Sequence, residues 1–403
     1  MKLRSPLELD EMEIPTDRDW RYTRIRQAMA RLELDGVLAF GPGWRRENVR
    51  YLAGCPVRGS FALAYLPAVG EPVAFAAWPE DRRAIQRTGW IGDVRPLDLP
   101  RCGEVVARLE GGSSSQRIGI AHLELMPRAI LEGVRAGLPR THFVSATGLM
   151  NRVRLVKSEW ELAQFRLACA VADEGWKSFV EACEPGAHEF EIVARVEAKL
   201  KSLGAEDNFM LMASGRAEVM GMTPPGRRRL QMGDLVRTEL TPQLNGYYAQ
   251  LCRTMVLGEP DEGQVRSFEL FDEALEAGLS VTRAGATAHD IAKAENDVFR
   301  TWGFAEYCTS KFTRVRGHAL GLHPDEFPPL LEDEMTVLEE NSVIIVHPNT
   351  YTPLAGYFVF GNPVVVKRNG YESLLKTERQ LFQAAPSPAT GIKRSHETRI
   401  GSP

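Results

Sequence analysis

The sequence has no long apolar run, and no segment approaches the ~20 consecutive apolar residues that span a bilayer. Its opening segment, MKLRSPLELDEMEIP, also lacks the apolar core of a signal peptide. The net charge of −4 gives no excess of basic residues that would favour a polyanionic partner. We therefore expect a cytoplasmic protein with neither a membrane nor a nucleic-acid partner.

Cysteine is scarce, and none of it is arranged in C-x-x-C pairs. This spacing argues against a zinc knuckle and against a disulfide framework, so we expect reduced thiols. The cysteines are Cys55, Cys102, Cys169, Cys183, Cys252 and Cys308.

The chain of 403 residues is long enough for two hydrophobic cores. Helical and strand patterns alternate through the first part, which predicts an α/β domain over residues 1–155. Ser158 and Glu161 then form a capping box before a helix with one apolar stripe, where a second domain, 156–384, begins. The remaining segment, 385–403, is small and polar, and we expect it to be disordered.

An internal repeat lies within the second domain. Residues 183–204 and 282–303 align without a gap and share Gly-Ala, an acidic residue followed by Ile, and a closing Gly. Each copy reads as a turn that enters a helix and ends at glycine. Two copies predict a duplicated domain with pseudo-twofold symmetry and a site between its halves.

Four polar residues lie on predicted strands of these halves. Glu239 and Gln250 flank an Asn-Gly turn, so we expect them to face each other across a β-hairpin. His318 and His347 follow, 29 residues apart. A single histidine on an apolar strand is usually structural, but two histidines with one carboxylate also suit a divalent ion.

Five motifs in order resemble a known family: RLVKSEWELAQFRLA, MGDLVRTEL with GYYAQLCRTMVLG, GHALGLHPDEFPP, VLEENSVIIVHP and GYFVFGNPVVVKRNGYESL. They resemble the pita-bread fold shared by methionine aminopeptidase, aminopeptidase P, prolidase and creatinase, over roughly residues 155–380. The segment with RENVRYLAG resembles the N-terminal domain of aminopeptidase P, prolidase and creatinase. The resemblance implies an α/β N-terminal domain, an α+β pita-bread domain and a homodimer.

The family's two-metal ligand pattern is altered when it is laid on this sequence. Its two aspartates fall on Glu239 and Gln250, and its histidine is kept as His318. Its two glutamates fall on His347 and Gly361. One carboxylate does not offset two divalent ions, so a dinuclear centre is not expected. The site would hold no metal, or one Fe, Mn or Zn ion on Glu239, His318, His347 and Gln250.

Creatinase, by resemblance, offers a metal-free precedent within this fold. His318 or His347 would then act as acid or base, with Glu239 as orienting carboxylate, base or nucleophile. We predict hydrolysis of a C–N bond in a small polar nitrogen compound, as in creatinase or ectoine hydrolase. The open alternatives are a mononuclear lyase or oxygenase, a non-catalytic binding module and an Xaa-Pro peptidase.

Further residues are predicted to contact a small-molecule substrate. Met222 falls where the family has a substrate-side histidine, and Asp325 and Glu326 fall on its second His-Glu pair. Cys252 shares a face with Gln250, where a small apolar filler is favoured over a nucleophile. The predicted substrate-binding residues are Tyr248, Met222, Asp325, Glu326, Arg58 and Phe61, the last two through the partner subunit's site.

Overall fold

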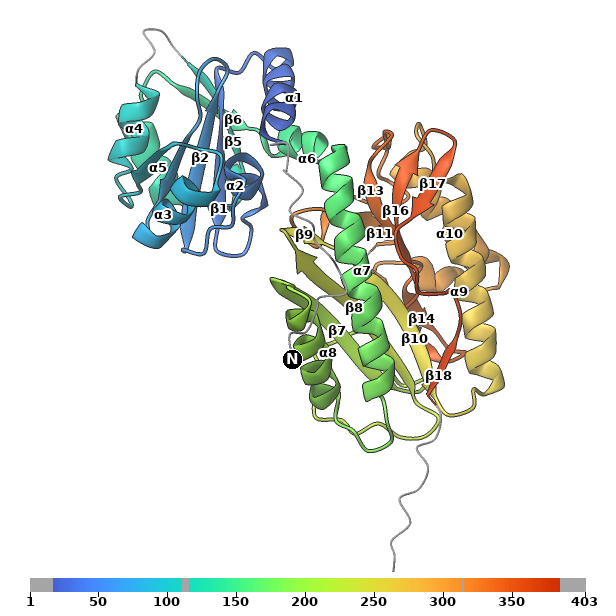
Figure 1. The fold of residues 1–403 in the computed structure, drawn as a ribbon. Helices are drawn as coiled ribbons and strands as arrows, with labels where there is room; N and C mark the ends of the chain where they lie inside the picture. Colours follow the sequence, from blue (N-terminus) through green and yellow to red (C-terminus); the bar gives the residue numbers. More distant parts are fainter. Residues whose placement is uncertain (1–16, 111–115, 314, 385–403) are drawn as a thin grey trace, which may run out of the picture.

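The computed structural model describes residues 17–110, 116–313 and 315–384. Figure 1 shows an N-terminal domain in blue beside a larger domain that runs from green to red, with α6 and α7 leading from one to the other. The tail that we expected to be disordered, 385–403, lies outside the described residues. Within the described ranges, no helix has both the length and the apolar character needed to cross a bilayer.

The N-terminal domain is built on a six-stranded mixed sheet with the order β4-β3-β2-β1-β5-β6. Strand β1 pairs antiparallel with β2 and parallel with β5, and every residue of β1 is buried. The central strands β1, β2 and β3 are apolar and almost fully buried, as expected where both faces of a sheet are covered. The elements are α1 (Arg18–Arg31), β1 (Gly36–Pro42), α2 (Glu47–Ala53), β2 (Phe61–Pro67), β3 (Val73–Ala76), α3 (Pro79–Thr88), β4 (Asp93–Pro96), α4 (Gly103–Leu109), β5 (Arg117–Ala121), η1 (Leu123–Leu125), α5 (Arg128–Gly137), β6 (His142–Ser145) and α6 (Thr147–Leu155).

The first half of the second domain places helices α7 and α8 against a sheet with the order β18-β10-β8-β7, to which β9 adds. Helix α7 begins at the predicted capping box, in which Ser158 Oγ accepts from Glu161 N at 3.1 Å and Glu161 Oε2 accepts from Ser158 N at 3.0 Å. The elements are α7 (Glu159–Ala182), α8 (Glu189–Ser202), β7 (Asp207–Gly215), β8 (Leu235–Leu244), β9 (Tyr247–Tyr248), β10 (Leu251–Leu257) and β18 (Phe382–Ala384).

The second half repeats this plan with α9 and α10 and a sheet with the order β12-β11-β13-β16-β17. The two predicted repeat helices, α8 and α10, each span 14 residues and begin at a capping box. Each is followed by a glycine at positive φ, Gly204 at 91° and Gly303 at 83°. The remaining elements are α9 (Glu262–Val281), α10 (Ala288–Thr301), η2 (Ala305–Cys308), β11 (Gly317–Ala319), β12 (Glu326–Pro329), β13 (Val343–Val346), β14 (Thr350–Thr352), β15 (Gly356–Phe358), β16 (Asn362–Lys367) and β17 (Gly370–Ser373).

The β8–β10 hairpin corrects one prediction. Asn245 and Gly246 both have positive φ, 49° and 91°, as a type I′ turn requires. This turn sets a register in which Cys252, and not Gln250, lies opposite Glu239. Gln250 is therefore a diagonal neighbour of Glu239. The predicted pairing was wrong because it centred the turn one residue too early.

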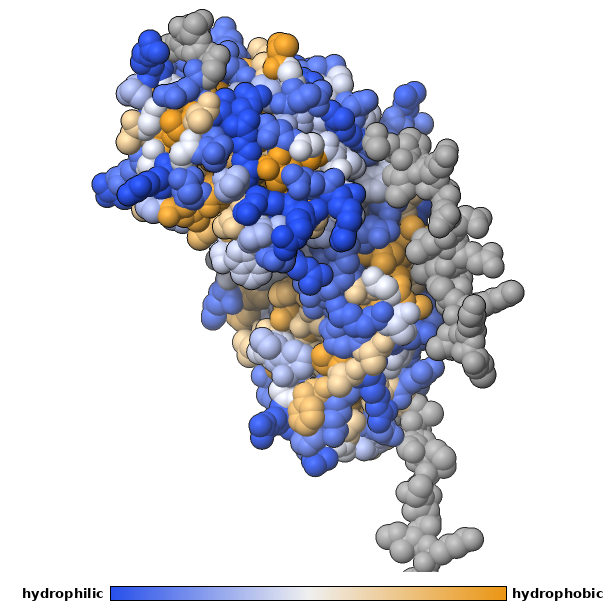
Figure 2. All heavy atoms as spheres, turned by 60° about the vertical axis from the view of Figure 1, so that its left-hand side comes forward, coloured by the Kyte–Doolittle hydropathy of each residue, from blue (hydrophilic) through white to orange (hydrophobic). Residues whose placement is uncertain are grey.

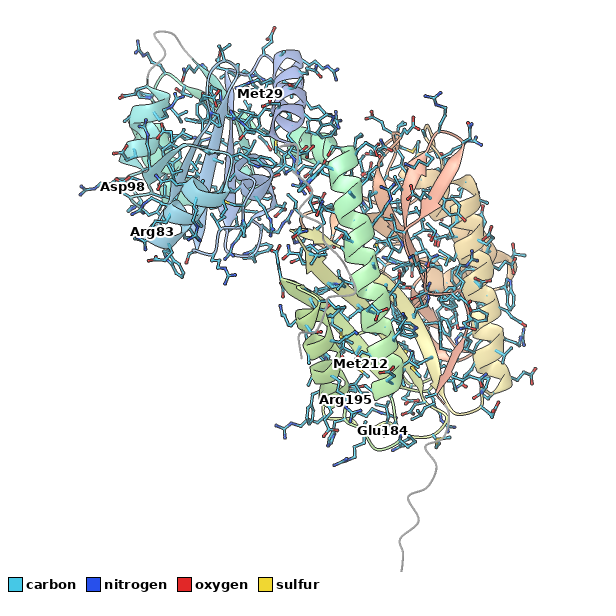
Figure 3. The ribbon with its side chains drawn as sticks, in the orientation of Figure 1. Met29, Arg83, Asp98, Glu184, Arg195 and Met212 are labelled. Carbon is cyan, nitrogen blue, oxygen red and sulfur yellow. The ribbon has the colours of Figure 1, made fainter. Side chains whose placement is uncertain are left out.

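Polar contacts join the two domains. Arg21 of α1 donates to the hydroxyl of Tyr247 at 2.7 Å, and that hydroxyl donates to Glu161 Oε1 at 2.9 Å. Figure 2 shows the waist between the domains, where apolar residues lie among hydrophilic ones. Figure 3 marks two core methionines, Met29 of α1 and Met212 of β7, both fully buried.

Candidate active site

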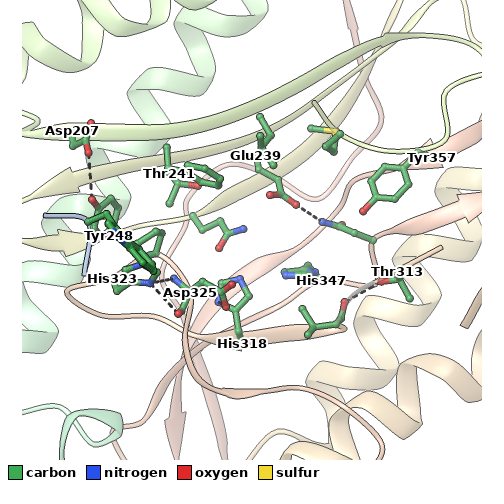
Figure 4. A pocket seen from close by; sticks show the side chains of 18 residues that line it. Asp207, Glu239, Thr241, Tyr248, Thr313, His318, His323, Asp325, His347 and Tyr357 are labelled. Atoms are coloured by element: carbon green, nitrogen blue, oxygen red, sulfur yellow. Dashed lines mark hydrogen bonds and ion pairs between the residues drawn. The ribbon is translucent and has the colours of Figure 1, made fainter. Parts of the chain in front are cut away.

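A cavity of about 670 Å³ lies between the two sheets of the second domain (Figure 4). Strand β8 of the first sheet contributes Glu239, and β11 of the second sheet contributes His318. The duplicated architecture thus places one cavity between its halves, as the repeat predicts. The predicted residues that line it are Glu239, Gln250, His318, His347, Tyr248, Met222 and Asp325.

Glu239 is held by an amide. Asn349 Nδ2 donates to Glu239 Oε1 at 2.9 Å, and Asn349 Oδ1 accepts from the backbone N–H of Phe360, also at 2.9 Å. Asn349 is only 2% exposed. The carboxylate is therefore fixed by a donor whose own orientation is fixed by the backbone.

Gln250 and Cys252 lie beside this pair. Gln250 Nε2 lies 3.7 Å from Cys252 Sγ, and its Oε1 is buried without a hydrogen-bond partner among the residues that the structure describes. Burial, and next the negative charge of Glu239, raise the pKa of the Cys252 thiol well above its usual value. The thiol is therefore neutral, which agrees with the prediction of a small buried filler rather than a nucleophile.

The rings of His318 and His347 both line the cavity, with centroids 5.4 Å apart and ring planes at 72°. His318 lies on β11, and its Nδ1 is 3.0 Å from the carbonyl oxygen of Ala319. A proton on Nδ1 makes this bond and leaves Nε2 as the basic nitrogen. His347 directly follows β13, and its backbone N–H donates to the carbonyl oxygen of Arg316 at 3.1 Å.

The rim of the cavity is acidic and aromatic. The Tyr248 hydroxyl lies 3.5 Å from Asp207 Oδ2, and burial, then the Asp207 charge, raises the pKa of Tyr248 above its usual range. His323 Nδ1 lies 3.0 Å from the carbonyl oxygen of Asp325, and burial lowers the pKa of His323, against the effect of Glu47. Both Tyr248 and His323 are therefore neutral at pH ~7.

Several residues that line the cavity were not predicted from the sequence. Asn349 lies two residues after His347, but nothing in the sequence indicates which backbone group its amide meets. His323 stands in the same GHALGLHPDE motif as His318, and this proximity was the available signal. The lining residues that we did not predict include Trp44, Asp207, His323, Asn349 and Tyr357.

Three predicted substrate contacts lie away from this cavity. Glu326 is buried in ion pairs with Arg154 and Lys157, because β12 runs beneath α6. Phe61 opens β2 and stacks on Phe40 with centroids 5.8 Å apart, so it belongs to the N-terminal core. Arg58 lines a neighbouring cavity of about 630 Å³, which shares Trp44, Asp207, Tyr248 and His323 with the first.

The donor set determines whether a metal fits this site. Across the described ranges, no three His, Cys, Asp or Glu side chains are grouped so as to hold a metal ion. Of the predicted ligands, Glu239 alone is a carboxylate, and an N–H of Asn349 is directed at it. A donor hydrogen repels a cation, so the residues present do not fit a resident divalent ion.

Comparisons with known proteins show the family. A model of metallopeptidase family M24 matches residues 163–368, and a model of the creatinase/prolidase N-terminal domain matches residues 21–156. An Xaa-Pro dipeptidase of Pyrococcus horikoshii is 29% identical over 365 residues, 90% of this chain and 98% of that protein. An Xaa-Pro dipeptidase of Pyrococcus furiosus is 30% identical over 242 residues, 60% of this chain and 68% of that protein. The crystal structure of the prolidase from Pyrococcus horikoshii covers 90% of this chain and all of its own, with a TM-score of 0.79 and 25% identity.

The chain belongs to metallopeptidase family M24, with the pita-bread fold and a creatinase-type N-terminal domain, which confirms the predicted family and fold. Our prediction of a hydrolase for a non-peptide C–N bond is wrong, because relatives that match 90% and 60% of the chain are named as Xaa-Pro dipeptidases. That prediction gave more weight to a few altered ligand positions than to the similarity of the whole chain.

Proposed function

We propose that the cavity binds a small dipeptide with proline in its second position and hydrolyses the peptide bond. The observation that carries this proposal is the match to an Xaa-Pro dipeptidase over 90% of this chain and 98% of that protein. A cavity of about 670 Å³ is within the size range of small-molecule sites.

The lining suits a ligand that is apolar in its ring and cationic at its amino end. Trp44 is 69% exposed and Phe209 is 50% exposed, and both line the cavity, where they present apolar surface to a ligand. A proline ring would cover such surface. Asp207 and Asp325 are carboxylates in the same lining, and they would attract the α-ammonium group of a dipeptide.

Peptide hydrolysis needs a base for water, donors to the oxyanion and a proton for the departing nitrogen. Glu239, oriented by Asn349, is the proposed base: it would take a proton from the attacking water and return that proton to the departing nitrogen. His347 is the proposed donor to the oxyanion, and His318, whose basic Nε2 is an acceptor, would orient the attacking water; both rings line the cavity. Gln250 Oε1, a buried acceptor, would receive an N–H of the ligand.

The test is release of proline from Ala-Pro and Gly-Pro, with Pro-Gly as the comparison substrate. The protein is assayed after chelation and again with added Mn²⁺. We expect turnover of the Xaa-Pro dipeptides and a loss of about 100-fold in kcat for Glu239→Gln. Glu269→Gln, an exposed site on α9, is the matched control and should leave kcat unchanged. If no proline is released after chelation and none is released with added Mn²⁺, the proposed activity is excluded.

A second candidate is a binding module that takes the same dipeptides without cleaving them. The single carboxylate among the predicted ligand positions favours it, because fewer charged groups remain to drive chemistry. Calorimetric titration with Ala-Pro separates the two functions. Saturable heat of binding without release of proline would support the binding module.

A further inference from the structure

Asn349 has a contact pattern that points to a specific role. It lies in the loop between β13 and β14, lines the cavity and is 2% exposed. Its Oδ1 accepts from Phe360 N, so the amide cannot turn over without losing a backbone hydrogen bond in a buried place. Its Nδ2 is therefore committed to the Glu239 carboxylate, as the dashed line from Glu239 in Figure 4 shows.

A second amide donor faces the same corner. Cys252 Sγ lies 4.0 Å from Asn349 Nδ2 and 3.7 Å from Gln250 Nε2, and Cys252 pairs directly with Glu239 in the ladder. Asn349 thus directs its amide N–H group at the Glu239 carboxylate, and both amides direct an N–H group at the neutral Cys252 thiol. Such N–H groups carry positive partial charge, which stabilises an anion and opposes the entry of a cation.

Gly361 closes the corner from the opposite strand. A Cβ placed on Gly361 would lie 2.5 Å from His347 Cβ and 2.7 Å from the carbonyl oxygen of Val346. Ordinary cross-strand Cβ pairs are about 4.5–5.5 Å apart, so this position has no room for a side chain. Gly361 therefore cannot carry a carboxylate side chain unless His347 or Val346 moves.

We propose that Asn349 is a positioning residue: its amide holds the Glu239 carboxylate in the way a bound cation otherwise would, and by doing so excludes a divalent ion from the cavity. Replacing that one donor with an acceptor should open a cation site on Glu239. The catalytic part of this inference rests on the proposed dipeptidase activity, whereas the cation-binding part does not.

The first experiment uses Asn349→Asp, which keeps an acceptor for Phe360 N–H and exchanges the donor for a carboxylate oxygen. Calorimetric titration with Mn²⁺ should show binding at least about tenfold tighter than to the wild-type protein. Asn362→Asp is the matched control: Asn362 is also buried, and its Oδ1 accepts from Arg253 NH2 at 2.8 Å. An Asn349→Asp variant that binds Mn²⁺ no better than wild type or this control would overturn the proposal.

The second experiment measures Ala-Pro turnover by the same variants after chelation. Loss of the positioning contact should lower kcat by about 10- to 100-fold, as for other orienting partners, with little change in KM. A rise in KM with an unchanged kcat would contradict a positioning role. If wild type releases no proline, the proposed function fails, but the Mn²⁺ titration still decides the role of Asn349. If Asn349→Asp does not unfold cooperatively, Asn349→His, which adds a ligand without a charge, replaces it in the titration.

Discussion

Substitution of the single residue Gly361 tests how closely the strands around the cavity approach each other. We expect Gly361→Ala to lower the free energy of unfolding by about 1–3 kcal/mol, because the added methyl group overlaps His347 and Val346 and forces the backbone apart. Urea unfolding followed by circular dichroism measures this change. Gly221→Ala is the control, since a Cβ there meets nothing within 4 Å, and its effect should stay within about 0.5 kcal/mol. Equal effects of the two substitutions would show that the corner is not closed.

The sequence predicted the central polar residues but not their supports. Glu239, Gln250, His318 and His347 all line the cavity, because motif order in a known fold is enough to bring them together. Asn349 could not be predicted in the same way, since its role depends on contacts with strands far away in the chain. Glu326 was assigned to the substrate because a motif position cannot reveal which cations are buried beside it.

At the scale of elements, local signals predicted helices well and strand pairing less well. The Ser158 capping box and the repeat helices α8 and α10 appear as predicted, because caps and terminal glycines act within a few residues. The β8–β10 hairpin was predicted with the wrong register. Its pairing depends on which two residues occupy the positive-φ positions of the turn. If the centre of the turn moves by one residue, each residue of β8 faces a residue two positions further along β10, so Glu239 faces Cys252 in place of Gln250.

Helix α10 carries a buried glutamic acid, Glu295, which should make the stability of the protein depend on pH. Glu295 is 0% exposed, and both of its carboxyl oxygens lack a hydrogen-bond partner within the described part of the chain. Burial raises the pKa of Glu295 well above its usual value, although Arg316 opposes this shift. The folded state therefore holds a proton that the unfolded state releases, and stability falls by about 1.4 kcal/mol per pH unit between the two pKa values.

Glu295→Gln should remove this loss, because glutamine is neutral at every pH. We expect the variant to be close to wild type in stability at about pH 5 and more stable at about pH 8. Urea unfolding across this range measures the difference. Glu269→Gln on the exposed side of α9 is the control and should leave the slope as in wild type. A constant difference between Glu295→Gln and wild type across the range would contradict the raised pKa.

The two domains share a buried ionic network that sequence patterns did not indicate. Arg154 of α6 pairs with Glu326 of β12 at 2.5 Å and donates to Asn48 of α2 at 2.6 Å. Lys157 lies 3.8 Å from the other oxygen of Glu326. Composition and periodicity predicted two domains, but the charges between them become partners only once both have folded.

Removing the carboxylate of this network should destabilise the molecule strongly. Burial would raise the pKa of Glu326, but Arg154, with Lys157, outweighs it and holds that pKa below its usual value. Glu326→Gln leaves these cations buried without their anion, which costs about 3–5 kcal/mol at neutral pH. Because the folded pKa is depressed, this advantage of wild type is fully present above the ordinary pKa of about 4.3 and disappears as the pH falls through the folded value. The free energies of unfolding of wild type and Glu326→Gln, measured from neutral to acid pH, should therefore converge as the pH falls.

Glu80→Gln is the control: it breaks an exposed pair with Arg83 and should cost less than about 1 kcal/mol. If Glu326→Gln costs no more than this surface control, the network does not hold the domains together.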